Sequence, residues 1–360
     1  MGTTTTGTAT SEAARRLGIA HPIIQGPFGG GLSTAKLTAT VSNLGGLGSY
    51  GAHVLAPDAI AGVASDIRAL TDEPFALNLW VSDHDPGGRA FTDADLDRVW
   101  PIFEPYFREL GLERPALPER FHHAFDDQIE ALLSAKPRVF SFVFGVPSRA
   151  VLEACKKLGI VTAGAATSIA EARALDEAGV DLIVATGAEA GGHRPSFLAP
   201  AEDSLMGTFT LVQLVAPRVK APVIAAGGIA DGRGVRAALA LGAQAAQIGT
   251  AFLACEESNA SDDHRRWLFS ERAEKTTLTR AFSGRLARGL RNEWTERMAA
   301  HAPGLPPFPV TSWLTSRMRA AALEAGRTEW ISLWGGQIAP NLKHRTAARL
   351  MTSLLEDIPT

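Results

Sequence analysis

Apolar and polar positions along the chain form a recurring pattern that predicts repeated helix–strand units. A stretch with helical spacing ends at a glycine, and a short, almost continuously apolar stretch follows at once. The clearest examples are VLEACKKLG-IVTAGAA, EARALDEAG-VDLIVATG and GVRAALALG-AQAAQIGT, whose helices end at Gly159, Gly179 and Gly242. Glycine is common just beyond a helix because it adopts a left-handed backbone. Continuously apolar strands are typical of parallel sheets that are covered on both faces, so the pattern predicts parallel βαβ units.

Eight apolar stretches are predicted strands, which is the number that closes a parallel barrel. They lie at residues 23–26, 46–50, 75–80, 138–144, 160–165, 181–186, 222–227 and 243–249. We therefore predict an α/β fold, a (β/α)₈ TIM barrel over residues 20–255. A polar, proline-containing insertion at about 84–135 follows the third strand. A helical extension over 256–360 follows the eighth, and such segments usually cap the active-site face.

The composition adds a large core and excludes several classes of partner. Of the 360 residues, 46% are hydrophobic and 20% are charged, and the net charge is −3. These values argue against a nucleic acid or an anionic membrane held by electrostatics, and no apolar run is long enough to span a membrane. Cys155 and Cys255 lack the spacing of a disulfide framework or a metal site, which favours a cytoplasmic location and no metal. Residues 1–19, which begin MGTTTTGTAT, are expected to form a flexible tail.

Gly46, Gly48 and Gly51 match the letters of a dinucleotide-binding motif but not its context. The G-x-G-x-x-G motif binds a dinucleotide when it follows a strand and opens a helix. Here the helical stretch STAKLTATVSNLG comes first, and the glycines then open a strand. The reversed order argues against a Rossmann fold.

Glycines end the two neighbouring strands where a TIM barrel commonly holds a phosphate. PVIAAGGIADGRG ends the seventh predicted strand with Gly227 and Gly228, and QIGTAF ends the eighth with Gly249 and Thr250. Glycine lets the backbone approach an anion closely. The helix after the seventh strand presents N–H groups and a dipole that favour phosphate. Because the loops after strands seven and eight often bind phosphate in this fold, we predict a phosphate site here, although such glycines also make ordinary tight turns.

His193 is the strongest candidate for acid–base chemistry. GAEAGGHRPSF directly follows the sixth predicted strand, so its glycines allow the imidazole to project over the barrel mouth. Imidazole is the side chain best suited to proton transfer near neutral pH. A loop histidine that only hydrogen-bonds the backbone is the alternative. Of the other histidines, His21 and His53 flank the first two strands and fit structural roles, and the rest, including His264, are expected to be solvated.

Polar residues at two further strand ends are predicted to face the same side of the barrel. Gln25, Gly26 and Pro27 end the first strand, and Asn78 lies in the third. An amide there could pair with the ring nitrogens and carbonyls of a flat cofactor. The late segment SLWGGQ at 332–337 combines an aromatic ring, two glycines and an amide, and Trp334 fits either a core or a site.

The motifs HPIIQGPFGG, GGLGSYGA, FALNLW, SFVFG, GAEAGGHR, PVIAAGGIADGRG, QIGTAF and SLWGGQ together resemble the nitronate monooxygenases, formerly called 2-nitropropane dioxygenases. The resemblance runs from about residue 20 to 340 and implies a TIM barrel with one non-covalent FMN. The residues that it assigns to FMN are Gln25, Gly26, Pro27, Asn78, Gly191, Gly192, Gly227, Gly228, Gln247, Gly249 and Thr250.

The same resemblance implies that His193 is the catalytic histidine. It would deprotonate a neutral nitroalkane or orient the anionic nitronate, and the flavin would pass an electron to dioxygen, which yields a carbonyl compound and nitrite. Pro195 stands where the family usually has glycine, which stiffens the loop beside the substrate.

Two other functions fit parts of the sequence. An NAD(P)H-dependent flavin enoyl-acyl-carrier-protein reductase family shares the AGGH, AAGGI and QIGT motifs, but this chain has no basic cluster for a carrier phosphopantetheine. A barrel that binds a phosphate ligand without redox activity is the third possibility, and the histidine at the barrel mouth argues against it.

Overall fold

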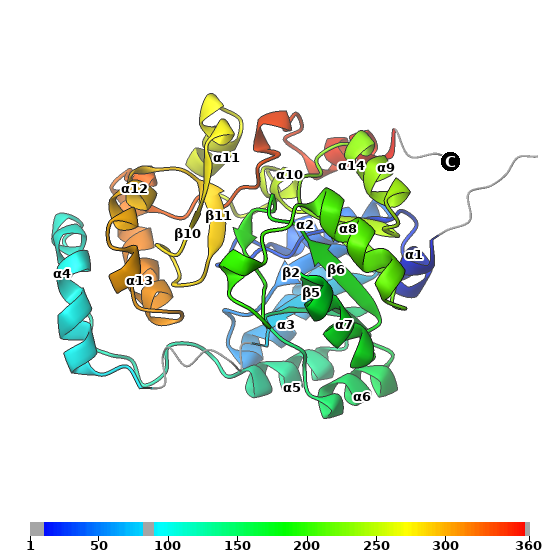
Figure 1. Ribbon diagram of the computed structural model, residues 1–360, viewed down its shortest axis with the longest axis horizontal. Coiled ribbons are helices and arrows are strands. Elements are labelled where there is room, and N and C mark those ends of the chain that lie inside the picture. The colour runs from blue at the N-terminus through cyan, green and yellow to red at the C-terminus, as the bar shows by residue number, and fades with distance from the viewer. Residues whose placement is uncertain (1–10, 82–89, 357–360) are drawn as a thin grey trace, which may run out of the picture.

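A computed structural model describes residues 11–81 and 90–356, and within them eight parallel strands form a TIM barrel (Figure 1). The strands are β1 (Ile23–Gln25), β2 (Gly48–Gly51), β3 (Phe75–Trp80), β4 (Val139–Val143), β5 (Val161–Ala166), β6 (Leu182–Thr186), β8 (Val223–Ala226) and β9 (Ala245–Ile248). Each coincides with one of the eight predicted strands. The prediction of a (β/α)₈ barrel is confirmed.

Parallel pairing runs around the barrel in the order β1-β9-β8-β6-β5-β4-β3-β2. A bridge between Ile24 and Leu47 joins the two ends of this order. The Leu47 carbonyl accepts from the Gln25 N–H at 2.9 Å, and the Leu47 N–H donates to the Ile23 carbonyl at the same distance. A barrel closed in this way presents all eight carboxyl strand ends on one face.

Helices surround the barrel and connect its strands. They are α2 (Ala35–Asn43), α3 (Pro57–Arg68), α5 (Phe125–Ala135), α6 (Arg149–Leu158), α7 (Ile169–Glu177), α8 (Thr208–Val215), α9 (Gly232–Ala240) and α14 (Ala347–Leu355). Gly159, Gly179 and Gly242 have φ values of +71°, +83° and +104° at the ends of α6, α7 and α9. The glycines that the repeat pattern identified are therefore left-handed helix ends, as predicted.

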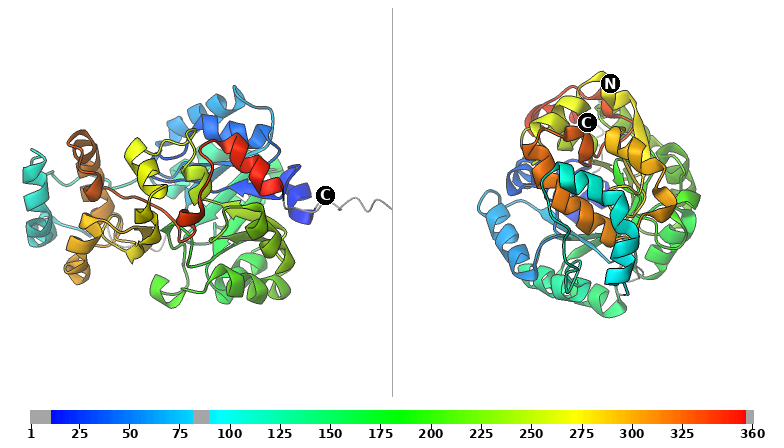
Figure 2. Two further views of the ribbon diagram at one scale, coloured as in Figure 1. Left: turned by 90° about the horizontal axis from the view of Figure 1, so that it is seen from above. Right: turned by 90° about the vertical axis from the view of Figure 1, so that its left-hand side faces the viewer.

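A cap covers the carboxyl ends of the barrel strands. The short helix α10 (Thr250–Leu253) directly follows β9 and packs in the barrel core. The cap contains α4 (Asp93–Glu109), α11 (Asp262–Leu268), α12 (Glu293–Ala299), α13 (Val310–Glu324), β10 (Thr276–Thr279) and β11 (Ala287–Leu290). In Figure 1 these elements lie to the left of the barrel, and the end-on view of Figure 2 shows α4, α12 and α13 in front of it. The cap has its own apolar core, in which Trp294 of α12 contacts Phe103 and Tyr106 of α4.

The expected boundaries need three corrections. Residues 11–19 are not a flexible tail, because α1 (Glu12–Leu17) buries Ala13, Ala14 and Leu17 against the barrel interior. The insertion after β3 ends before α5, which packs on α3 and β3 as a barrel helix. The extension over 256–360 is not only a cap, since α14 packs between α2 and α9 and completes the helical ring. In each case the deciding contact joins segments that are far apart in the sequence.

A second sheet links the cap to the barrel. β11 pairs antiparallel with β10 and with β7 (Gly192–His193), which follows β6 of the barrel. Residue 193 is thus held by backbone pairing between a barrel loop and the cap. Short 3₁₀ turns complete the described chain at Ala201–Asp203, Ala216–Arg218, Glu271–Glu274, Ala302–Gly304, Thr328–Trp330 and Ala339–Asn341. No helix of residues 11–81 and 90–356 is long and apolar enough to cross a membrane.

Candidate active site

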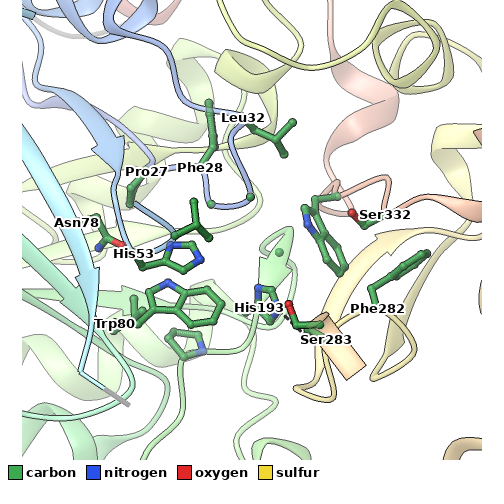
Figure 3. Close-up of a pocket in the computed structure, with 18 of the residues that line it drawn as sticks. Pro27, Phe28, Leu32, His53, Asn78, Trp80, His193, Phe282, Ser283 and Ser332 are labelled. Atoms are coloured by element: carbon green, nitrogen blue, oxygen red, sulfur yellow. Dashed lines mark hydrogen bonds between the residues drawn. The ribbon is translucent and has the colours of Figure 1, made fainter. Parts of the chain in front are cut away.

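A cavity of about 1060 Å³ lies between the carboxyl strand ends and the cap. Its walls include side chains from β3, the β1 and β6 loops, and the cap (Figure 3). The sequence-predicted residues that line it are Gly26, Pro27, Asn78, Gly191, Gly192, His193, Gly227, Gly228, Gln247, Gly249 and Thr250. The fold therefore brings together residues that the sequence separates by more than 200 positions.

Gln25 lies behind the cavity wall, although the sequence placed it against a cofactor. Its side chain is fully buried, its Oε1 accepts from the Ser49 N–H at 2.9 Å, and its Nε2 donates to the Gly26 carbonyl. The amide is used to join β1 to β2, because buried polar groups need partners. Gln25 supports the loop at Gly26 and does not face the cavity.

The glycines after β8 leave room for a close backbone approach. Gly227 and Gly228 have φ values of +108° and +71°, which L side chains rarely adopt. A Cβ at Gly227 would stand 2.8 Å from the Thr208 Oγ1. Across from them, Gly249 precedes α10, and a Cβ there would meet nothing within 4 Å. This bare backbone between strand ends is the geometry in which TIM barrels hold a phosphate.

The N-terminus of α9, which was expected to face the phosphate, is capped by a side chain of the protein itself. Asp231 caps α9, since its carboxylate accepts from the Gly234 N–H at 3.0 Å and pairs with Arg233 at 2.7 Å. An anion is not favoured where a carboxylate already holds the helix N-terminus. The prediction that α9 contributes to the phosphate site is therefore wrong. The short helix α10 begins at Thr250, directly after Gly249, and no side chain caps its N-terminus.

His193 projects into the cavity from β7. Its Nε2 lies 2.7 Å from the Ser283 Oγ in the cap, and its ring contacts the Trp80 ring edge-on at 5.0 Å (Figure 3). Burial lowers the pKa of His193 to about 4, because the imidazolium would lose its hydration. The ring is therefore neutral near pH 7. The sequence could not identify Ser283, which is 90 positions away.

His53 is a second cavity histidine, which the sequence analysis left as structural. Its ring stacks on Trp80 with the centroids 3.8 Å apart and the planes 5° from parallel. Its Nδ1 is buried and has no hydrogen-bond partner among the described residues. A Cβ at Gly29 would collide with the His53 Cε1, so this glycine makes room for the ring.

The late glycines of SLWGGQ pack against the loop that precedes His193. The Gly336 N–H donates to the Thr250 Oγ1 at 2.9 Å, and the Gln337 N–H donates to the Glu189 carbonyl at 2.9 Å. Trp334 lines the cavity, 5.3 Å from the His193 ring. His264 was expected to be solvated, and this prediction is wrong. It is buried, and its Nε2 lies 2.9 Å from the Trp334 carbonyl oxygen.

The chain is similar to known proteins along nearly its whole length. The family model described as nitronate monooxygenase matches residues 11–357. The chain belongs to the nitronate monooxygenase family. It is 42% identical over 347 residues to the nitronate monooxygenase of Paraburkholderia phytofirmans, covering 95% of this chain and 93% of that protein. It is 37% identical over 352 residues to a probable nitronate monooxygenase of Staphylococcus haemolyticus, covering 97% of each.

Two solved structures are similar to this member of the nitronate monooxygenase family. The nitroalkane oxidase from Streptomyces ansochromogenes has a TM-score of 0.86 and 35% identity, and the match covers 96% of this chain and 97% of that one. FabK from Thermotoga maritima has a TM-score of 0.75 and 28% identity, with 97% and 96% covered. The TM-score and the sequence identity are both higher for the nitroalkane oxidase than for FabK.

In this member of the nitronate monooxygenase family, Arg194 holds the loop after β6 in place. Arg194 is 2% exposed, and its guanidinium donates to the carbonyls of Gly187 at 2.6 Å, Ser204 at 2.8 Å and Thr186 at 3.0 Å. A planar cation that binds three carbonyls fixes the end of β6 next to His193. Pro195, the departure from the usual family motif, lines the cavity directly after it. Among the described residues, no group of three or more His, Cys, Asp or Glu side chains is placed to hold a metal ion.

Proposed function

We propose that this protein catalyses the FMN-dependent oxidation of alkyl nitronates by dioxygen to carbonyl compounds and nitrite. The observation that carries the proposal is one cavity that joins a bare glycine cradle to a half-buried, neutral His193. Atoms and charge balance when two nitronate anions and one dioxygen give two carbonyl compounds and two nitrite ions. Family membership supports the oxidoreductase class.

The residues present fit one FMN. Gly227, Gly228, Gln247, Gly249 and Thr250 would hold its phosphate, because the three glycines lack Cβ atoms and Gly249 has open space beside it. Residues of β3 and of the loops after β1 and β6 would line the flavin ring: Gly26, Pro27, Asn78, Gly191 and Gly192. FMN supplies the electron transfer between nitronate and dioxygen when it is bound.

His193 would orient the nitronate by a hydrogen bond. The Ser283 Oγ accepts from the Arg285 N–H at 3.2 Å, and its hydroxyl lies within donating distance of the His193 Nε2 at 2.7 Å and of the Arg285 carbonyl at 3.3 Å. If the hydroxyl donates over the shorter contact, the neutral imidazole accepts at Nε2 and carries its proton on Nδ1, which could then donate that proton to an anion. A pKa of about 4 also makes the ring a weak base, since general bases work best with a pKa near the operating pH. We therefore place the nitronate, and not the neutral nitroalkane, as the preferred substrate.

The test compares oxygen uptake and nitrite release with ethylnitronate and with nitroethane. The purified protein should release FMN, and not FAD, on heating, and ethylnitronate should be oxidised much faster than nitroethane. His193→Asn should keep FMN bound and lower any nitroethane turnover by about 10²–10⁴-fold through loss of a base. Ethylnitronate arrives deprotonated, so its turnover should fall far less. His301→Asn, at an exposed surface histidine, is the control and should match the wild type.

Three results would change these assignments in different ways. Equal losses on both substrates in His193→Asn would remove any base role from that residue. Fast anaerobic bleaching of the flavin by NADPH, with no nitronate oxidation, would assign the reductase function instead. A colourless protein that binds no added FMN would leave only the phosphate-binding barrel.

A further inference from the structure

The cavity is too large for a single ligand of ordinary size. Its volume of about 1060 Å³ exceeds the range of roughly 300–1,000 Å³ in which one small molecule is usually bound. The residues assigned to FMN lie at the barrel strand ends. The remaining wall comes largely from the cap and the insertion and contains Phe121, Phe282, Phe308, Trp313 and Trp334. A second compartment for substrate therefore opens beyond the cofactor site.

A flat apolar face stands directly beside His193 in this compartment. Trp80 is 5.0 Å from the His193 ring and carries the His53 ring stacked on it at 3.8 Å (Figure 3). The missing Cβ at Gly29 leaves the space that the His53 ring fills. Burial, together with the nearby His193, Arg285 and His122, lowers the pKa of His53 to about 3, so the His53 ring is neutral near pH 7. The Arg285 guanidinium lies over the Trp80 ring, 5.0 Å from its centroid.

Aromatic rings from the cap and the insertion form further walls of the compartment. Phe308 lies 5.4 Å from Trp80, and Phe282 lies 5.5 Å from Trp334. Trp313 on α13 meets Phe121 of the insertion edge-to-face at 5.4 Å. Stacked or edge-to-face contacts between aromatic rings contribute favourable free energy in addition to that of the apolar area they bury. A short alkyl group would leave most of these rings without a contact to the substrate.

We infer that the substrate is a nitronate whose carbon carries a planar aromatic or similarly bulky apolar group. The nitronate end lies at His193, and the apolar group lies between the Trp80–His53 face and the rings of the cap. This inference rests on the proposed function, because it specifies the substrate of that same site. Pro195 stiffens the loop after His193 and is compatible with a preformed compartment of this size.

The experiment measures kcat/KM of the holoenzyme for the nitronates of phenylnitromethane and nitroethane. We expect the aryl nitronate to be preferred by at least about tenfold, since added apolar groups in a fitting pocket give roughly 10–200-fold discrimination. Trp313→Ala should lower the aryl-to-ethyl ratio by about tenfold, and Trp313→Phe should largely restore it. Trp100→Ala is the matched control, because Trp100 lies in α4 and packs against Phe107 away from the cavity wall.

The outcomes separate this inference from the proposed function. Oxidation of ethylnitronate with equal or greater efficiency than the aryl nitronate would overturn the inference and leave the function intact. Oxidation of neither compound would overturn the function. A ratio that Trp313→Ala leaves unchanged, or that Trp100→Ala lowers as much, would show that the cap aromatics do not select the substrate.

Discussion

Gly191→Ala tests whether the late segment at 334–337 forms part of the active site. A Cβ at Gly191 would stand 2.5 Å from the Gly336 nitrogen and 2.6 Å from the Gly335 carbonyl carbon. The backbone of Gly191 is outside the left-handed region, so only these contacts oppose a side chain. Because the opposing atoms belong to backbone, the alanine must push the two segments apart.

The separation would break two hydrogen bonds that hold the segment. These are the bonds from Gly336 N–H to the Thr250 Oγ1 and from Gln337 N–H to the Glu189 carbonyl. Overpacking costs about 1–3 kcal/mol and each lost hydrogen bond about 1 kcal/mol, so the variant should lose roughly 3–5 kcal/mol of local or global stability. Thr250 belongs to the proposed phosphate site, so FMN affinity should fall as well.

Chemical denaturation and flavin retention during gel filtration measure the two effects. Gly62→Ala is the control, because a Cβ at this helical position meets nothing within 4 Å and alanine should stabilise a helix by about 0.5–1 kcal/mol. The reasoning is refuted if Gly191→Ala unfolds at the wild-type denaturant concentration and keeps its flavin. In that case the two glycine segments would not be in backbone contact.

Three further predictions follow from single contacts. Gly228→Asp should abolish FMN binding measured by flavin fluorescence, because a carboxylate would face the phosphate. Gly228→Ala should bind FMN more strongly than the aspartate variant, and equal binding by both would show that the phosphate does not lie at Gly228. Ser283→Ala should lower nitronate kcat/KM by up to about tenfold through loss of one hydrogen bond to His193 while FMN stays bound, and an unchanged value would remove Ser283 from the site. Burial lowers the pKa of His264 from 6.5 to about 4, so the unfolded state takes up a proton at a higher pH than the folded state. The stability should therefore fall by about 3 kcal/mol as the pH drops from 6.5 to 4, at about 1.4 kcal/mol per pKa unit. His264→Gln should reduce this pH dependence of the denaturation midpoint, and an unchanged dependence would contradict the assignment to His264.

Local sequence patterns determined the barrel and the place of its site. Apolar runs of four to seven residues, three of them directly after the helix-ending Gly159, Gly179 and Gly242, located all eight strands, because strand burial and left-handed helix ends depend mainly on nearby residues. The same reasoning predicted that His193, Gly228 and Gly249 lie at one face, and all three line the cavity, because each follows a strand and the carboxyl strand ends share one face. The order of glycines and helix around Gly48 was likewise enough to argue against a Rossmann fold.

Local patterns misjudged three features, two because their partners are distant and one, the N-terminus of α9, because of a cap that lies next to it in the sequence. Gln25 follows a strand like the other site residues, yet its amide is taken by Ser49 and Gly26. The N-terminus of α9 looked open to an anion until Asp231 was seen to cap it. Ala13 and Leu17 looked like part of a tail because the barrel interior that buries them is built from residues later in the chain.

Only the tertiary structure decided what surrounds His193. Ser283 and Trp334 reach it from the cap, and His53 joins it through Trp80 on a different strand. None of these residues shares a local motif with His193, and their spacing in the sequence carries no signal of contact. The barrel fixes where strand ends meet, but side-chain packing between the cap and the barrel determines the shape, charge and size of the cavity. For that reason the sequence indicated the chemistry of the site, whereas the fold was needed to infer its substrate.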